Sequence, residues 1–330
     1  MEGALRSRGR GRRERLVAIE DWPVAGVFRT ARVARRHTRV VRLEVRAEGQ
    51  VGRGECVPYA RYGESAEGVA RTLRSAPLRL ERVRELPAGA ARDALDAALL
   101  DLEAKLRGVA VHALLGLPAP RPVATAFSVG VDAPAAMEAA ARRRRGWPWL
   151  KLKADPDAVL ARVDAVRRGA GVGARLIVDA NESWSPEAWR ELAPALRERG
   201  VVLVEQPLPV GEDAVLREGR AVPVCADESA HEAADVGRLA ERYDLVNVKL
   251  GKAGGLRGAL AVAAAARRRG LGVMVGCMVS TSLAIAPAML VAGGADVVDL
   301  DGALLLARDR VGGLACRGPW LRPAPRSFWG

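Results

Sequence analysis

The feature that most constrains the fold is a series of short apolar runs that end in charged residues and recur about 22 to 26 residues apart. Three of them, ARLIVDAN, VVLVEQP and VPVCADES, carry Asp179, Glu205 and Asp227 at their ends. Continuous β-branched runs of about five residues are typical of parallel strands that are buried on both faces. Segments with helical spacing separate the runs, and the interval matches one strand with its crossover helix.

Eight such strands are predicted, near residues 123–129, 148–153, 175–179, 201–205, 222–227, 245–249, 272–276 and 296–300. The pattern predicts an α/β fold, a (β/α)8-type barrel, in which the C-terminal ends of the strands meet on one face and carry the active site. One charge at a strand end would be an ordinary solvated loop residue. Six charges in phase with the strands indicate a functional site instead.

The segments outside the barrel predict two further parts of the 330-residue chain. Residues 1–118 combine alternating apolar and polar runs with helical stretches, which predicts an N-terminal α+β domain with an antiparallel sheet. Its first 15 residues are Arg-rich and predict a disordered leader. Residues 119–306 form the predicted barrel domain, which begins at the Pro-rich LGLPAPRPV. Residues 307–330 predict a tail that packs back on the first domain.

Lysine is rare in this chain, although positive charge is abundant. Of the 52 Lys and Arg residues, only five are lysine: Lys105, Lys151, Lys153, Lys249 and Lys252. Four of them fall in two short segments, WLKLKAD and LVNVKLGK, at predicted strand ends. An ammonium group can lose its proton and act as a base, whereas a guanidinium stays charged. The lysines therefore indicate proton transfer, and we interpret Lys252 as structural or peripheral.

Composition argues against several other classes of protein. The net charge is +13, but the arginines are spread along the chain and aromatic content is 4%, without the interleaved pattern of a nucleic-acid-binding surface. No apolar run approaches the ~20 residues of a membrane span. The four cysteines form no CxxC pair, which predicts reduced thiols in a cytoplasmic protein. The three histidines form no cluster, which argues against zinc.

The charged strand ends together suggest a metal-assisted reaction. Asp179, Glu205 and Asp227 end three consecutive strands, and three convergent carboxylates require a cation between them; hard oxygen ligands favour Mg²⁺. Lys151 and Lys153 share one strand face because side chains alternate. Lys249 comes from the sixth strand, roughly opposite the second, so a ligand held at the metal would have an ammonium group on each side.

Two bases on opposite faces of a metal-held carboxylate favour removal of the proton α to that carboxylate. The metal stabilises the enediolate charge that develops. Neighbouring cations and the metal are expected to lower a lysine pKa toward neutrality, so that one lysine can accept the proton. Return of a proton by the second lysine on the other face would produce the epimer.

The ordered motifs resemble those of the enolase superfamily, in its muconate-lactonising-enzyme-like branch. They are LKLKAD, VDAN, VEQP, ADES and NVKLGKAGG, with GRGECVPYARYGES in the N-terminal domain and GCMVSTSLAIAPA and DLDG near the last strands. Within the superfamily the chain is most similar to the dipeptide epimerases, particularly L-Ala-D/L-Glu epimerase. Asp299 and Asp301, a DxD on the eighth strand, and PYARYGES carry this resemblance.

The resemblance implies a role for each matching residue. Lys153 and Lys249 would be the acid/base pair, with Lys151 as an electrostatic helper. Asp179, Glu205 and Asp227 would bind one Mg²⁺ per subunit. Asn181 and Glu228 would support these ligands, and the N-terminal domain would cap the active site. The residues expected to bind the substrate are Asp299 and Asp301, which would hold the dipeptide ammonium, together with Arg32, Met278 and Ser280.

Several alternatives remain open at this point. An N-acylamino-acid racemase or o-succinylbenzoate synthase would use the same lysines and carboxylates, but its substrate lacks the free ammonium that a DxD would hold. An epimerase for other dipeptides would differ in the capping loop, and Arg32, Arg35 and Arg39 disfavour cationic side chains. A barrel that binds a ligand or nucleic acid without turnover is a third alternative. The expected partner is a dipeptide, with no nucleic acid or membrane, and the chain is expected to form a homo-oligomer.

Overall fold

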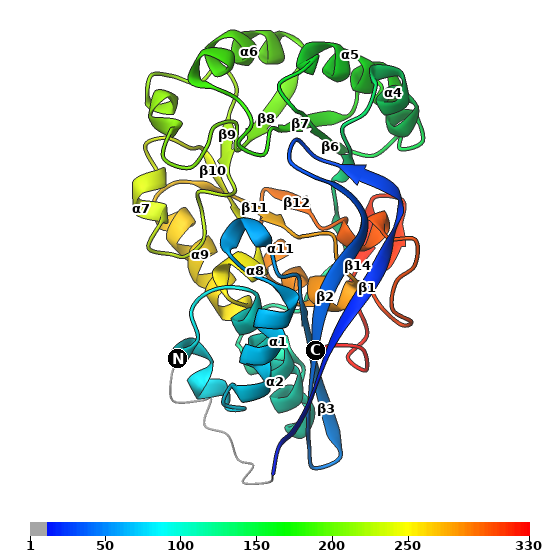
Figure 1. Ribbon diagram of the computed structural model, residues 1–330, viewed down its shortest axis with the longest axis vertical. Coiled ribbons are helices and arrows are strands. Elements are labelled where there is room, and N and C mark those ends of the chain that lie inside the picture. The colour runs from blue at the N-terminus through cyan, green and yellow to red at the C-terminus, as the bar shows by residue number, and fades with distance from the viewer. Residues whose placement is uncertain (1–11) are drawn as a thin grey trace.

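The protein consists of an eight-stranded parallel barrel and an N-terminal antiparallel sheet that lies beside the barrel mouth (Figure 1). The computed structural model describes residues 12–330. Within them, no helix is long and apolar enough to cross a bilayer. The barrel sheet has the strand order β12-β11-β10-β9-β8-β7-β6-β5. A backbone hydrogen bond of 2.8 Å from Ala126 N to Val298 O joins its two edges.

All eight predicted barrel strands are confirmed. They are β5 (Phe127–Val129), β6 (Trp149–Lys153), β7 (Arg175–Asp179), β8 (Val201–Glu205), β9 (Val224–Ala226), β10 (Leu245–Val248), β11 (Gly272–Gly276) and β12 (Val297–Asp299). The first differs from its prediction because residues 123–129 form two strands. Only β5 belongs to the barrel, whereas β4 (Val123–Ala124) pairs with the C-terminal hairpin of β13 (Ala315–Arg317) and β14 (Trp320–Arg322).

Helices cover the outside of the barrel, as the Ala- and Leu-rich spacing predicts. The longer ones are amphipathic and bury their apolar positions against the strands. They are α4 (Pro134–Arg142), α5 (Val159–Ala170), α6 (Pro186–Glu198) and α9 (Leu256–Arg268). Shorter turns complete the ring: α7 (Val236–Leu239), α8 (Leu250–Ala253), α10 (Ser282–Ile285), α11 (Met289–Ala292) and the 3-10 helices η4 (Asp213–Arg217), η5 (Ala286–Ala288) and η6 (Gly302–Leu305).

The N-terminal part pairs a three-stranded antiparallel sheet with helices. Its elements are β1 (Glu14–Arg29), β2 (Ala34–Ala47), β3 (Gln50–Cys56), η2 (Ala60–Tyr62), α1 (Ala66–Ser75), η3 (Leu80–Glu85), α2 (Ala90–Leu106) and α3 (Val111–Leu114). The glycines of GRGEC let α2 approach β3 closely. A Cβ on Gly52 or Gly54 would lie 2.1 Å from the carbonyl oxygen of Ala98 or Ala94, respectively. Glycine is therefore required at both positions.

The two ends of the described chain lie against the N-terminal part. Residues 1–11 of the leader lie outside the described residues, but β1 begins at Glu14, so the prediction was wrong at its C-terminal end. The C-terminal residues contact the N-terminal part: Gly330 N donates to Asp101 Oδ1 at 3.0 Å, and Arg310 contacts Glu55. The division of the chain into domains at residues 118 and 306 stays a prediction.

Candidate active site

The charged residues at the C-terminal strand ends meet in one place because the barrel strands are parallel and in register. Lys153 of β6 lies opposite Asp179 of β7, which lies opposite Glu205 of β8. Asp227 directly follows β9, and Lys249 directly follows β10. Each of the five residues is at most 8% exposed. The charged groups are therefore buried and lie close together. Charges on a solvated loop would instead be exposed.

Lys151 lies at the centre of the carboxylates. Its Nζ is 2.9 Å from Asp179 Oδ2, 2.7 Å from Glu205 Oε2 and 2.8 Å from Asp299 Oδ2. One ammonium therefore bridges β7, β8 and β12. Burial lowers the pKa of Lys151, but the negative charges of Asp179, Asp299 and Glu205 outweigh burial and raise the pKa well above its ordinary value.

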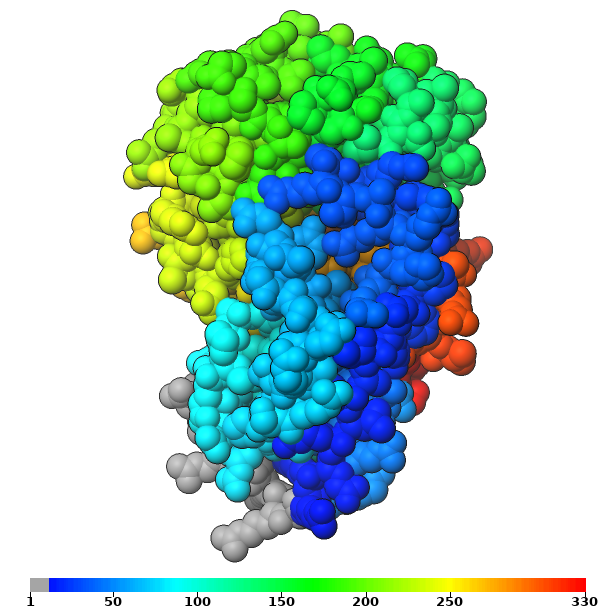
Figure 2. All heavy atoms as spheres, in the orientation of Figure 1, coloured from blue at the N-terminus to red at the C-terminus, as the bar shows by residue number. Residues whose placement is uncertain are grey.

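Lys153 and Lys249 approach the same cavity from different strands. Lys153 Nζ donates to Asp179 Oδ2 at 2.5 Å, and Lys249 Nζ donates to Asp227 Oδ2 at 2.6 Å. Both side chains line a cavity of about 70 Å³. The N-terminal atoms cover much of the barrel face here, and barrel atoms are visible through a gap between them (Figure 2). Two amines beside carboxylates in one cavity can perform proton transfer.

The carboxylates around Lys249 raise its pKa. Burial lowers the pKa of Lys249, but Asp227 and Glu205 raise it well above its ordinary value. The shift toward neutrality that is expected beside a bound metal stays a prediction. The crowded negative charge also raises the pKa of two carboxyl groups. Burial and Asp179 raise the pKa of Glu205 to about 7, and burial and Asp227 raise the pKa of Glu228 to about 8.

The donor set fits a hard divalent cation. Within residues 12–330, no three carboxylate, imidazole or thiol groups are arranged so that they could hold a metal ion together. However, buried Glu228 Oε2 and Asn181 Oδ1 have no hydrogen-bond partner, and Glu205 Oε2 contacts Lys151 without acceptable hydrogen-bond geometry. Buried unpaired oxygens are costly. A cation among them would satisfy these acceptors and offset the charge that raises the carboxyl pKa values.

Asn181 and Glu228, which the sequence predicts as supporting residues, contact each other beside Asp179. Asn181 N donates to Asp179 Oδ1 at 3.0 Å, and its side chain Nδ2 contacts Glu228 Oε1 at 3.4 Å. Asn181 has φ of +47°, in the left-handed region that asparagine tolerates better than most residues. Asn181 lies two residues after the end of β7, and its backbone N–H orients the carboxylate of Asp179.

Lys252, which we interpreted from the sequence as structural or peripheral, is buried at the site. Its Nζ contacts Asp227 Oδ1 at 2.5 Å and also the backbone oxygen of that residue. A peripheral position is therefore wrong, because α8 is a single turn that brings Lys252 back toward the strand end, whereas a structural role stays a prediction. Lysine rarity already set this residue apart, and that signal could have identified it.

Asn247 is a second buried residue that the sequence did not single out. It precedes Lys249 on β10 with its side chain on the same face, and its Nδ2 donates to Glu205 Oε1 at 2.9 Å. Gly276 makes room for it, since a Cβ there would lie 2.5 Å from Asn247 Oδ1. An amide inside an apolar strand, in VNVKL, was the available signal.

Asp299 and Asp301 line the same cavity as Lys153 and Lys249. Asp301 Oδ2 accepts a hydrogen bond from Ser128 N at 2.6 Å, and Asp299 Oδ2 contacts Lys151. Asp299 Oδ1 is buried and has no hydrogen-bond partner. A buried carboxylate oxygen without a donor is suited to a cationic group of a ligand.

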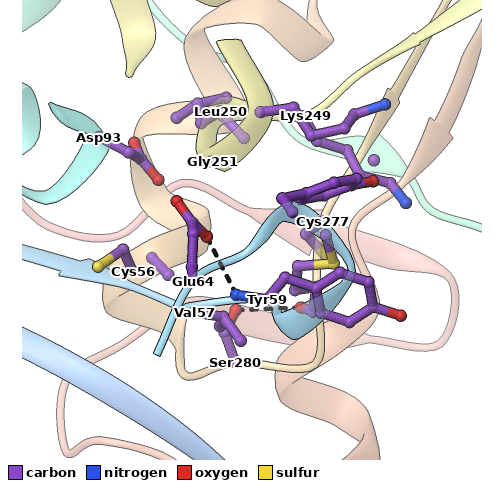
Figure 3. Close-up of a pocket in the computed structure, with 16 residues that line it drawn as sticks. Cys56, Val57, Tyr59, Glu64, Asp93, Lys249, Leu250, Gly251, Cys277 and Ser280 are labelled. Atoms are coloured by element: carbon purple, nitrogen blue, oxygen red, sulfur yellow. Dashed lines mark hydrogen bonds between the residues drawn. The ribbon is translucent and has the colours of Figure 1, made fainter. Parts of the chain in front are cut away.

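The remaining predicted substrate-binding residues are divided between the cavity and its surroundings. Met278 lines the cavity, whereas Arg32 does not and instead contacts Glu182. Ser280 lines a second, smaller cavity, which Lys249 also lines (Figure 3), and donates to Met278 O at 3.1 Å. The arginine on the cavity wall is Arg35, whose guanidinium lies 5.1 Å from the Tyr59 ring centre. Arg35 has no ion pair among residues 12–330.

Comparisons with known proteins agree with this architecture. A family model described as "Mandelate racemase / muconate lactonizing enzyme, N-terminal domain" matches residues 12–116, and one described as "Enolase C-terminal domain-like" matches residues 135–300. The chain is 42% identical over 300 residues to an L-Ala-D/L-Glu epimerase of Escherichia coli, which covers 88% of this chain and 93% of that protein. It is 40% identical over 289 residues to an N-acetyl-D-glutamate racemase of Pseudoalteromonas, which covers 84% and 91%.

Solved structures give the same result. An enolase family member from Agrobacterium tumefaciens with homology to dipeptide epimerases, bound to sodium and L-Ala-L-Glu, superposes with a TM-score of 0.93 at 42% identity. The match covers 97% of this chain and all of that one. A dipeptide epimerase from Enterococcus faecalis, complexed with Mg and L-Leu-L-Tyr, superposes with a TM-score of 0.87 at 27% identity and covers 94% of this chain and 96% of that one. The chain belongs to the mandelate racemase/muconate lactonizing enzyme family of the enolase superfamily.

Proposed function

We propose that this protein is a Mg²⁺-dependent dipeptide epimerase that acts on L-Ala-D/L-Glu. The observation that carries the proposal is that Lys153 and Lys249, from β6 and β10, line one cavity together with Asp299 and Asp301. Two amines in one cavity suit removal and return of a proton at one carbon atom. A carboxylate pair beside them suits a substrate with a free ammonium group.

The proposed reaction inverts the α-carbon of the glutamate residue. One lysine, as the free amine, takes the α-proton from one face, and the C–H electron pair moves into the substrate carboxylate as an enediolate. The other lysine, as the ammonium, donates a proton to the opposite face. Lys151 adds positive charge beside the substrate carboxylate. Mg²⁺, held by Asp179, Glu205 and Asp227, would supply further positive charge that stabilises the enediolate.

Asp299 and Asp301 are proposed to hold the ammonium of the alanine residue, and Met278 to contact the substrate from the cavity wall. For Arg32 and Ser280 the positions in the structure do not support substrate contact, and we assign the side-chain carboxylate of glutamate to Arg35 instead. The four cysteines of the chain are free. A cytoplasmic location and a homo-oligomeric state are part of the proposal.

Racemisation of an N-acylated glutamate is a second candidate, because a relative with that name is 40% identical to this chain. The lysine chemistry would be the same, but an N-acyl group is uncharged. It would leave Asp299 and Asp301 without a cation in a buried site, which is unfavourable. The DxD therefore favours the dipeptide.

Incubation in D₂O with Mg²⁺ separates the two candidates. The panel contains L-Ala-L-Xaa dipeptides and N-acetyl amino acids, and mass spectrometry measures deuterium at the α-carbon. We expect exchange with inversion in L-Ala-L-Glu, at a higher kcat/KM than in N-acetyl-L-glutamate. Preferred turnover of N-acetyl-L-glutamate would support the second candidate, and no exchange in any compound would refute both.

Arg35→Ala should lower kcat/KM for L-Ala-L-Glu by about 10- to 100-fold, the range expected for loss of a charge-assisted hydrogen bond. Activity on L-Ala-L-Ala, which has no side-chain carboxylate, should change less than about threefold. Arg36→Ala removes the neighbouring, exposed arginine and serves as the control. Equal losses on both dipeptides would show that Arg35 stabilises the loop without recognising the substrate side chain.

A further inference from the structure

Glu182, in the loop after β7, is a buried carboxylate outside the proposed catalytic set. Its side chain has no exposed surface, and its φ of +63° lies in the left-handed region, which is uncommon for residues other than glycine. The preceding Asn181 has positive φ as well. Two consecutive residues in this conformation are unfavourable unless other contacts hold them there.

The contacts of Glu182 come from three segments far apart in the sequence. Arg61 donates to both carboxylate oxygens, from Nε at 3.1 Å and from a terminal nitrogen at 2.9 Å. Arg32 donates to Glu182 Oε2, and its Nε also donates to Asn181 O at 2.8 Å. Val210 N donates to Glu182 Oε1 at 3.0 Å. Paired, charge-assisted hydrogen bonds of this kind are stronger than neutral ones and define an orientation.

The two arginines belong to the two N-terminal segments that form the outer wall of the cavity. Arg32 lies in the tip of the β1–β2 hairpin, which reaches over the barrel (Figure 1), and the neighbouring Thr30 and Arg35 line the cavity. Arg61 lies in η2, between Tyr59 and Tyr62, which also line the cavity. One barrel carboxylate thus connects both sides of the wall to the strand end that carries Asp179.

We propose that Glu182 is a positioning residue that latches both wall segments over the cavity and thereby sets the affinity for the substrate. The arginine side chains are 30% and 39% exposed, so they can be solvated when the latch opens. A substrate that needs both walls binds only to the latched fraction of molecules, and its apparent affinity falls in proportion to that fraction. The effect on substrate affinity depends on the proposed function, whereas the latch itself does not.

The test is Glu182→Gln, which keeps the side-chain shape and removes the charge. We expect KM for L-Ala-L-Glu to rise about tenfold, with kcat within about threefold of the wild-type value. Hydrogen–deuterium exchange in peptides covering residues 28–35 and 59–64 should become faster without substrate, while exchange in β2 stays unchanged. Glu67→Gln is the matched control, because Glu67 pairs with Arg39 at 3.1 Å on the exposed surface of the same part of the chain.

The outcomes separate the latch from its alternatives. A lower KM in Glu182→Gln would mean that Glu182 competes with the substrate for the arginines, which overturns the proposal. An unchanged KM with unchanged exchange in both segments would overturn it as well. If the wild-type protein epimerised no dipeptide, the proposed function would fail, and the exchange measurement would still decide whether Glu182 holds the two segments.

Discussion

Lys153→Ala and Lys249→Ala are each expected to lower the rate of L-Ala-L-Glu epimerisation by roughly 10²- to 10⁴-fold, the usual contribution of a positioned acid or base. Each ammonium contacts one carboxylate of the cluster, Asp179 or Asp227, and both lysines line the cavity. Lys151 remains bound to Asp179 in either variant, so the fold should be retained.

The two variants should differ in stereochemistry, and this difference tests the roles directly. With one lysine removed, the other can still exchange the α-proton on its own face. We therefore expect deuterium exchange without inversion, for L-Ala-L-Glu in one variant and for L-Ala-D-Glu in the other. NMR and chiral chromatography would measure exchange and inversion separately.

Lys105→Ala is the control, because it removes the one lysine that lies away from the cavity, on α2, where it binds Asp101. It should leave kcat unchanged. Full epimerisation by either cavity variant would contradict the two-base assignment.

Asp301→Asn is expected to lower kcat/KM for L-Ala-L-Glu by about 10²- to 10³-fold, because truncating one partner of a buried charge pair costs at least about 2 to 5 kcal/mol. Asparagine can keep the hydrogen bond from Ser128 N through its side-chain oxygen. The fold should therefore survive, and the loss should fall on dipeptide binding. Titration with Mg²⁺ in a calorimeter should show an unchanged affinity for the metal, and an equal loss of metal affinity would contradict the ammonium assignment.

The same residue predicts a pH dependence. Burial and the charge of Asp299 raise the pKa of Asp301 to about 7, so the carboxyl group is protonated below that pH and ionised above it. An ammonium binds the ionised form, and KM for L-Ala-L-Glu should fall as pH rises from about 6 to about 8. This dependence should disappear in Asp301→Asn, which cannot ionise.

Much of this site could be predicted before the structure because its pattern is local. Each catalytic candidate follows an apolar run of about five residues, and parallel strands in a barrel bring such ends together without further information. Lys153, Asp179 and Glu205 were placed in this way. The rarity of lysine then distinguished functional amines from an abundant background of arginine.

Other residues could not be placed, because their partners are distant in the sequence. Arg32 and Arg35 are three residues apart with the same charge, and only the hairpin geometry determines that one binds Glu182 and the other lines the cavity. The division of residues 123–129 into β4 and β5 depends on a hairpin at the opposite end of the chain. Lys252 approaches Asp227 only because α8 is a single turn.

The sequence by itself determined the barrel and the order of its charged strand ends, because these depend on periodicity. The choice of Lys153 and Lys249 as the acid/base pair came from the family resemblance and stays a prediction. The tertiary structure alone decided which charges pair, since pairing in a buried site depends on distances between side chains that the chain folds together. Glu182 is the clearest case, because its two arginine partners are more than a hundred residues away in the sequence.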